Sequence, residues 1–255
     1  MSGESELSYA VSEQIAEISL KRPPVNALSL ALLEAIIAAL RRAAADDGVR
    51  AVILTSAVPG RFSAGLDLDL ILGKSEQEVR RFLDKLYVEL ADVQFNLGKP
   101  SIAAVNGAAR GGGMTLAISC DVLLAASSAT FGYPEIDLAL PPAIHFSHLP
   151  RIVGRHRAFE LLFSGRAFGA EEAASLGLVS RVVADAELRD AARVLGRTFA
   201  RKSPAGMRLA RLAFMRANDH RAGIADAVEV FCNAAVTETA QEGLRAFLEK
   251  RPPKW

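Results

Sequence analysis

The sequence has few of the residues that mark disulfide-rich, metal-binding or strongly charged proteins. Its 255 residues include two cysteines, Cys120 and Cys232, which lie far apart in apolar segments expected to be helical. A disulfide framework or a zinc site is therefore not expected, and a reducing compartment is favoured. The net charge is +1, so no strong electrostatic field favours nucleic acid or an anionic membrane as a partner.

Long uninterrupted apolar runs are also missing. Charged residues such as Arg110, Asp121 and Arg151 interrupt the apolar stretches before they reach the roughly 20 residues that a membrane helix needs. The segment 1–6 is polar and acidic, with no apolar run behind it that would indicate a secretory signal. We expect a soluble, cytoplasmic protein, and its 51% apolar content is enough for a sizeable core.

The first half of the chain alternates between short apolar runs and amphipathic segments. Short apolar runs next to breakers predict strands at 15–20, 51–55, 101–105 and 121–126. Apolar residues at helical spacing predict helices at 28–45, with Ser29 as N-cap, and at 79–96 and 113–120. Repeated strand–helix units of this kind predict an α/β layered fold.

The second half is mostly helical in pattern. Helices are predicted at 155–164, 171–177, 187–202, 204–217, 223–237 and 239–251, with one strand at 179–183. We divide the chain into a core, 1–188, and a C-terminal helical region, 189–255. The helix at 223–237 is apolar on much of its surface, which is compatible with a subunit interface or with packing back on the core.

Two glycine-containing turns each follow an apolar, strand-like run. They are Phe62–Asp67 (FSAGLD) and Asn106–Met114 (NGAARGGGM). Small residues let a backbone turn so that its N–H groups point at a ligand. Two such turns brought together would offer two donors to one oxygen, which defines an oxyanion hole. A dinucleotide-binding fingerprint fails because position 116 is leucine, and no Gly-Lys-Ser/Thr indicates a phosphate loop.

A carboxylate follows downstream, at Glu135. Its apolar neighbours Phe131, Tyr133 and Ile136 are expected to raise the pKa of this carboxyl group by desolvation, as a general base requires. The residue that follows the glycine triplet and Met114 is uncharged, namely Thr115.

These motifs, taken in order, resemble the enoyl-CoA hydratase/isomerase (crotonase) family over nearly the whole chain. They lie at 20–28 (LKRPPVNAL), 62–68, 103–113, 120–121, 131–136, 149–151, 202–204 and 242–251. The resemblance implies a crotonase-like α/β spiral of repeated ββα units with a C-terminal helical region that forms trimers, often paired into hexamers. It implies an acyl-coenzyme A thioester as substrate, with coenzyme A as part of the substrate and no separate cofactor or metal.

The resemblance also assigns roles to individual residues. The oxyanion-hole donors map to the backbone N–H groups of Ala64 and Gly112. Each donor of this kind can lower the barrier to enolate formation by about 3 kcal/mol. Phe247 and Lys250 match residues that often reach the adenine end of a neighbouring subunit's ligand. The residues expected to bind the substrate are Val25, Ala64, Gly65, Leu66, Asp67, Gly112, Phe247 and Lys250.

The reaction depends on the number of carboxylates. Family members that hydrate a double bond typically use two glutamates, which map to Glu135 and to the position of Thr115. A hydroxyl group can position water, but its pKa is too high for it to cycle protons as a carboxylate does. We therefore expect a 3-enoyl-CoA to 2-enoyl-CoA isomerase that works through Glu135 alone. The alternatives are a hydratase, another crotonase-type reaction on a CoA ester, or a non-catalytic acyl-CoA-binding or assembly protein.

A second departure from the family pattern lies at 140–148 (LPPAIHFSH). Family hydratases usually carry a glycine-rich stretch here, whereas Ile144, His145 and Phe146 add bulk near the expected acyl pocket. His145 is a candidate for an accessory acid or base because its ordinary pKa is near neutral. The alternative is that the imidazole only fills space or bonds a backbone carbonyl.

Overall fold

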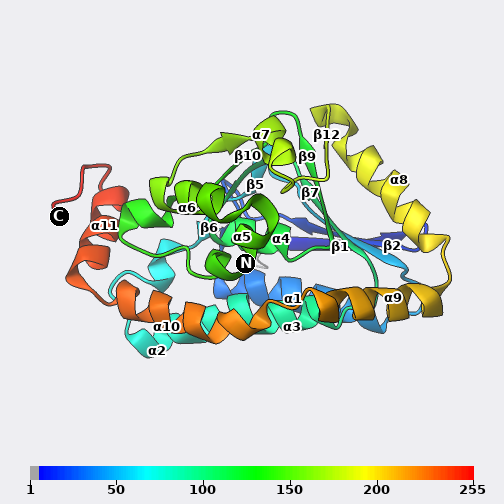
Figure 1. The fold of residues 1–255 in the computed structure, drawn as a ribbon, viewed down its shortest axis with the longest axis horizontal. Coiled ribbons are helices and arrows are strands. Elements are labelled where there is room, and N and C mark those ends of the chain that lie inside the picture. Colours follow the sequence, from blue (N-terminus) through cyan, green and yellow to red (C-terminus); the bar gives the residue numbers. More distant parts are fainter. Residues whose placement is uncertain (1–5) are drawn as a thin grey trace, which may run out of the picture.

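Two sheets form the centre of the structure, a computed structural model that describes residues 6–255. The larger sheet has the strand order β1-β2-β4-β7-β9-β12, and the smaller one has the order β11-β10-β8-β5. All pairs in the larger sheet are parallel except β1 with β2 at one edge. A third, two-stranded sheet pairs β3 with β6. Helices enclose the sheets on several sides (Figure 1).

The strands are β1 (Leu7–Ser12), β2 (Ile15–Leu20), β3 (Ala27–Leu28), β4 (Ala51–Ser56), β5 (Gly60–Ser63), β6 (Gly65–Leu66), β7 (Ser101–Val105), β8 (Gly107–Arg110), β9 (Val122–Ala126), β10 (Thr130–Gly132), β11 (Phe168–Gly169) and β12 (Arg181–Val183). The α-helices are α1 (Leu30–Ala45), α2 (Glu76–Leu83), α3 (Leu90–Phe95), α4 (Gly112–Ile118), α5 (His145–Val153), α6 (Arg155–Ser164), α7 (Ala170–Ser175), α8 (Leu188–Ala200), α9 (Pro204–Ala217), α10 (Ile224–Ala235) and α11 (Glu238–Leu248). Shorter turns are η1 (Leu68–Leu70), the π-helical η2 (Asp84–Glu89), η3 (Pro134–Leu138), η4 (Asp185–Glu187) and η5 (Arg221–Gly223).

The chain repeats a unit of two strands and a helix. In the successive pairs β4–β5, β7–β8 and β9–β10, the first strand joins the larger sheet and the second joins the smaller one. The first strands are neighbours in one sheet and the second strands are neighbours in the other, so each unit advances the chain by one position in both. The spiral of ββα units is confirmed.

Local sequence signals explain most of these elements. Ser29 caps α1 by accepting a hydrogen bond from the Leu32 N–H, and the apolar face of α1 is buried. All residues of β7 are buried, as expected for a strand covered on both faces. The helix predicted at 79–96 begins earlier, at Glu76, and contains the π-helical turn η2. The edge strand β1 and the helix α5, which contains Pro150, were not predicted.

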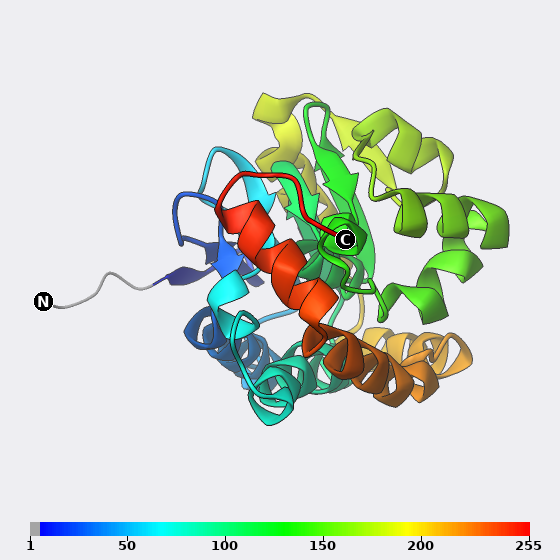
Figure 2. The ribbon, with the colours of Figure 1, turned by 90° about the vertical axis from the view of Figure 1, so that its left-hand side faces the viewer.

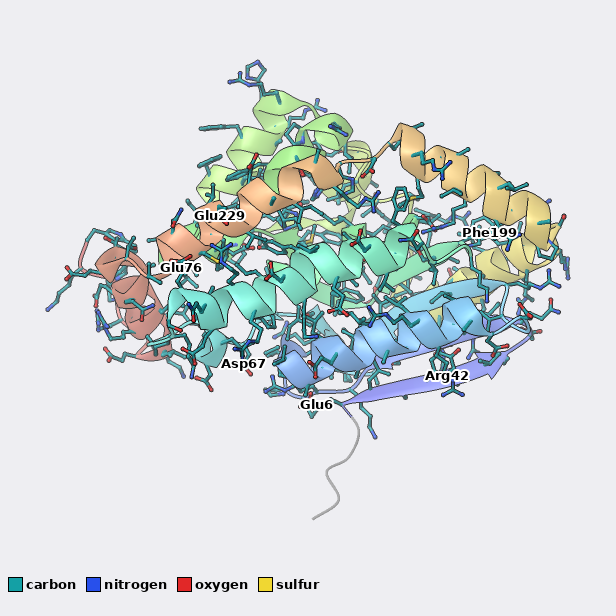
Figure 3. All side chains as sticks on the ribbon, turned by 90° about the horizontal axis from the view of Figure 1, so that it is seen from below. Glu6, Arg42, Asp67, Glu76, Phe199 and Glu229 are labelled. Carbon is teal, nitrogen blue, oxygen red and sulfur yellow. The ribbon has the colours of Figure 1, made fainter. Side chains whose placement is uncertain are left out.

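The helices after residue 188 pack on the rest of the chain. Helix α8 lies against the larger sheet, where Gly196 faces Ile15. Helix α10 runs beside α2 (Figure 3), and Arg80 pairs with both Glu76 and Glu229 there. The helix predicted at 223–237 therefore buries an apolar face within its own chain. The trimer, the hexamer and the division at residue 188 stay predictions.

Helix α11 crosses the end of the molecule near the C-terminus (Figure 2). It packs on η3, and Gly243 lies so close to the Leu138 carbonyl that a Cβ atom would stand 2.7 Å from this oxygen. Because η3 carries Glu135, the C-terminal helix supports the turn that holds the expected base. Among residues 6–255, no helix is long and apolar enough to cross a membrane.

Candidate active site

The two glycine-containing turns meet in space. Gly65 has a φ of +94°, and a Cβ atom on it would lie 2.8 Å from the Arg110 carbonyl oxygen and 3.2 Å from the Gly112 nitrogen. A side chain at position 65 would therefore separate the turns. Gly112 is the first residue of α4, so its N–H is one of the helix-terminal donors without an intrahelical acceptor. The juxtaposition that the sequence analysis required is present.

The donor expected in the first turn is engaged elsewhere. The Ala64 N–H donates to the Val25 carbonyl at 2.9 Å, so both groups serve to hold the N-terminal segment on the turn. This finding corrects the expectation for Ala64. Leu66 is paired with Leu28 in the parallel β3–β6 ladder, and the Leu28 carbonyl accepts from Asp67, the residue after Leu66. In this register the Leu66 N–H points away from β3, so Leu66 rather than Ala64 is the candidate donor of this turn.

Glu135 lies directly against the second turn. Its carboxylate is so close to Gly111 that a Cβ atom there would stand 2.8 Å from Oε1. The side chain is buried, and Oε2 has no hydrogen-bond partner among residues 6–255. Desolvation raises the pKa of this carboxyl group to about 7. A carboxyl with a pKa near neutrality can both accept and return a proton at physiological pH.

Thr115 and His145 also come together next to Gly111. The Thr115 N–H donates to the Gly111 carbonyl, and the Thr115 hydroxyl oxygen lies 3.5 Å from Nε2 of His145. His145 begins α5 and is completely buried, and its Nδ1 lies 3.2 Å from Nε2 of His148. Burial lowers the pKa of His145 well below its ordinary value and that of His148 to about 3. Both rings are therefore neutral at physiological pH.

A cavity of about 710 Å³ opens beside this side of the site. Its wall includes Thr115 and the bulky residues Ile144 and His148 of the segment that departs from the family pattern. Tyr87 of η2 also lines it, and the charge of Glu135 contributes to the raised pKa of this phenol. Of the three residues expected to add bulk near an acyl pocket, Ile144 lines this cavity, whereas His145 and Phe146 are not among its lining residues.

Asp67 has a structural partner. Its carboxylate accepts from the Arg22 guanidinium at 2.7 Å, and it caps the turn η1 through the Asp69 N–H. Figure 3 shows Asp67 beyond the end of α1. Phe247 and Lys250 lie at the end of α11, where both side chains are exposed. The structure does not bring them to the turns within this chain, and their role toward a neighbouring subunit stays a prediction.

Sequence reasoning missed three residues that the structure adds. Leu66 was expected to contact the substrate, and the strand register adds that its N–H points away from β3, which makes it a candidate donor. His148 and Gln94 are buried polar residues at the cavity wall, each with one atom unpartnered among residues 6–255. No local motif marks either residue, because α3 and α5 meet only in the fold. No group of three or more His, Cys, Asp or Glu residues within 6–255 is placed to bind a metal ion.

The chain matches known proteins over nearly its full length. The family model described as enoyl-CoA hydratase/isomerase matches residues 10–255. Human "methylglutaconyl-CoA hydratase, mitochondrial" is 39% identical over 237 residues, which cover 90% of this chain and 70% of the human protein. A "probable enoyl-CoA hydratase" of Bacillus subtilis is 36% identical over 98% of both chains. The human name includes a mitochondrial location, and a cytoplasmic location for this chain stays a prediction.

A solved structure agrees with these relatives. The crystal structure of enoyl-CoA hydratase from Bacillus anthracis superposes with a TM-score of 0.79 at 36% identity, covering 98% of this chain and 99% of that one. The match of sequence, fold and residue order covers the site as well as the sheets. The chain belongs to the enoyl-CoA hydratase/isomerase family and is an enzyme of this family that acts on CoA thioesters.

Proposed function

We propose that this chain adds water to the double bond of a 2-enoyl-CoA thioester. One observation carries the proposal: a buried carboxyl group, Glu135, with a pKa of about 7, packs against Gly111 at the point where the two turns meet. The relatives named hydratases support hydration over the isomerisation that the sequence favoured.

The thioester oxygen is the group that the turns would bind. The N–H groups of Leu66 and Gly112 would donate to this oxygen, where negative charge develops as the enolate forms. Two such donors contribute about 3 kcal/mol each to stabilisation of the transition state. The acyl group would extend into the cavity beyond Thr115.

Glu135 is proposed to move the proton. As its carboxylate takes a proton from water, the oxygen of the water forms a bond to C3 of the substrate. The electron pair of the double bond moves toward the thioester oxygen, and Glu135 then delivers its proton to C2. All atoms of the water end in the product, and Glu135 returns to its ionised form.

Isomerisation is the second candidate, and Thr115 is the observation that favours it. A single carboxylate can remove a proton from C2 of a 3-enoyl-CoA and return it to C4. A threonine in place of a second carboxylate leaves this reaction unaffected.

One experiment separates the candidates. The protein is incubated with a 2-enoyl-CoA and with a 3-enoyl-CoA, and the absorbance of the conjugated thioester is followed. Hydration predicts loss of absorbance with the 2-enoyl-CoA, and isomerisation predicts a gain with the 3-enoyl-CoA. The panel includes methylglutaconyl-CoA, because the human relative is named for it. Binding of acyl-CoA without turnover of any substrate would replace both candidates with the non-catalytic alternative.

A further inference from the structure

A chain of three buried polar side chains lies behind the proposed water site, and the chemistry above uses none of them. The hydroxyl of Thr115 is 3.5 Å from Nε2 of His145, and Nδ1 of His145 is 3.2 Å from Nε2 of His148. All three are buried. Two imidazoles in direct contact in a protein interior require complementary protonation, so one ring nitrogen donates and the other accepts.

The surroundings of His145 and His148 keep both imidazole rings uncharged. Tyr133 packs on His145 with 4.6 Å between ring centroids, and burial of this imidazole lowers its pKa despite a hydrogen bond to the Gly111 backbone that acts to raise it. His148 faces the ring of His220 at 5.4 Å and the positive charge of Arg151. No carboxylate among residues 6–255 pairs with either imidazole, so neither ring holds a second proton.

Thr115 is the end of this series of three side chains that faces the cavity. It lies one helical turn after Gly111, against which Glu135 packs, and it lines the cavity. A water molecule between Glu135 and Thr115 would have a carboxylate on one side and a hydroxyl on the other. A water that donates both of its protons to the protein keeps both lone pairs free, and its oxygen is a better nucleophile toward C3 than that of a water that accepts a hydrogen bond.

We propose that Thr115 binds the attacking water by accepting one of its protons in a hydrogen bond, and that His145 and His148 orient the Thr115 hydroxyl for this task. The Thr115 O–H would donate to Nε2 of His145, and the Nδ1–H of His145 would donate to His148. The second proton of the water would point to Glu135. The opposite direction of these hydrogen bonds would make Thr115 a donor to the water and lower the nucleophilicity of the attacking oxygen.

This proposal rests on the proposed hydration and assigns the role left by the absent second carboxylate. Thr115 acts as a catalytic residue because it contacts the reacting water. His145 and His148 are positioning residues, since they act through Thr115. No proton leaves the water through this chain, so the depressed basicity of the rings is no obstacle.

The test compares two variants of Thr115 in two reactions. Thr115→Val keeps the shape and removes the hydroxyl, whereas Thr115→Ser keeps the hydroxyl. Loss of one buried hydrogen bond to the water should lower kcat for hydration by about 10- to 100-fold in Thr115→Val. KM should change by less than about threefold, and Thr115→Ser should stay within about fivefold of the parent enzyme.

The second reaction is exchange of the α-proton of a saturated acyl-CoA in D₂O, which needs Glu135 and the oxyanion donors but no attacking water. We expect this exchange to be unchanged in Thr115→Val. Hydration by Thr115→Val at the parental rate would overturn the proposal and leave the proposed function intact. A parent enzyme that neither hydrates nor exchanges would instead overturn the proposed function.

The histidines are tested separately. His148→Leu should lower hydration about tenfold and leave exchange unchanged, while the exposed His156→Leu on α6 serves as the matched control. Nitrogen-15 NMR of the parent enzyme should show His145 as the neutral Nδ1–H tautomer when a product-like 3-hydroxyacyl-CoA is bound. The Nε2–H tautomer in that complex would contradict the proposed direction of the chain.

Discussion

Two groups of buried side chains around Gly111 respond in opposite ways to burial. Glu135 is an acid whose pKa rises to about 7 because its charged form loses solvation. His145 and His148 are bases whose pKa values fall for the same reason. Desolvation thus moves the pKa of the carboxyl group close to neutral pH, where it can exchange protons, and moves the pKa values of the imidazoles away from neutral pH.

This difference explains how a site with one carboxylate can still be built around water. A second carboxylate beside Glu135 would add a like charge to a buried site and raise one pKa further. A hydroxyl supported by neutral imidazoles adds polar contacts without that charge. Because Gly111 has no side chain, the Glu135 carboxylate can approach this backbone segment closely.

Removal of the Glu135 carboxyl group should have the largest effect, because it eliminates the acid from the pair of groups compared above. Glu135→Gln should lower turnover of enoyl-CoA by about 1,000-fold, because an amide cannot carry the proton. Binding of an acyl-CoA, measured by calorimetry, should change little, since the oxyanion donors are backbone groups. Turnover within tenfold of the parent enzyme would show that another group moves the proton.

A side chain at position 111, where it would displace the Glu135 carboxylate, should have the next largest effect on activity. Gly111→Ala places a Cβ atom 2.8 Å from Oε1 of Glu135 at a φ of +48°, so the carboxylate must move. We expect activity to fall by about 100-fold through misplacement of Glu135.

The matched control is Gly60→Ala, which has a φ of +65° and nothing within 4 Å of its added methyl group. It also places a side chain at a positive φ, but without the clash. Steady-state kinetics and thermal unfolding of both variants separate the two effects. Equal loss of activity in the two variants would assign the effect of Gly111→Ala to strain.

The pH dependence of protein stability should also report the raised pKa of Glu135. The pKa of Glu135 is about 7 in the folded state against an ordinary value of 4.5, so the unfolded state ionises first as the pH rises. Folding stability should therefore fall between pH 4.5 and 7, by about 3 kcal/mol in total, at 1.36 kcal/mol for each pKa unit. Glu135→Gln should lack this loss and unfold at higher urea concentration than the parent enzyme at pH 8. Identical pH dependence of the two proteins would contradict a desolvated carboxyl group.

The pH profile of catalysis should show the titration of Glu135 and no titration of His148. With Glu135 as the base, kcat/KM should rise about tenfold per pH unit below pH 7 and level off above it. His148, with a pKa lowered to about 3, should add no titration between pH 5 and 9. A bell-shaped profile across that range would mean that a second group titrates, and its loss in His148→Leu would identify the ring.

Much of the site could be anticipated from the sequence, and the failures have a common cause. The apolar sequence neighbours of Glu135 predicted its raised pKa, and the side chain is buried and desolvated in the fold. Ala64 was assigned the wrong partner because the direction of a backbone N–H depends on strand register, which the turn residues do not encode alone. His148 was missed because its contact with His145 required α5, a helix that Pro150 and its short length concealed.

The sequence by itself determined the family, the alternation of strands and helices, the two small-residue turns and the single carboxylate beside them. These features follow from local physics: apolar periodicity, N-caps, glycine freedom and desolvation by neighbouring residues. Only the tertiary structure decided that the Ala64 N–H is engaged while the Leu66 N–H points away from β3, and that Thr115 meets a pair of buried histidines. The reason is that each of these contacts joins segments far apart in the chain, and their geometry exists only after the spiral has closed.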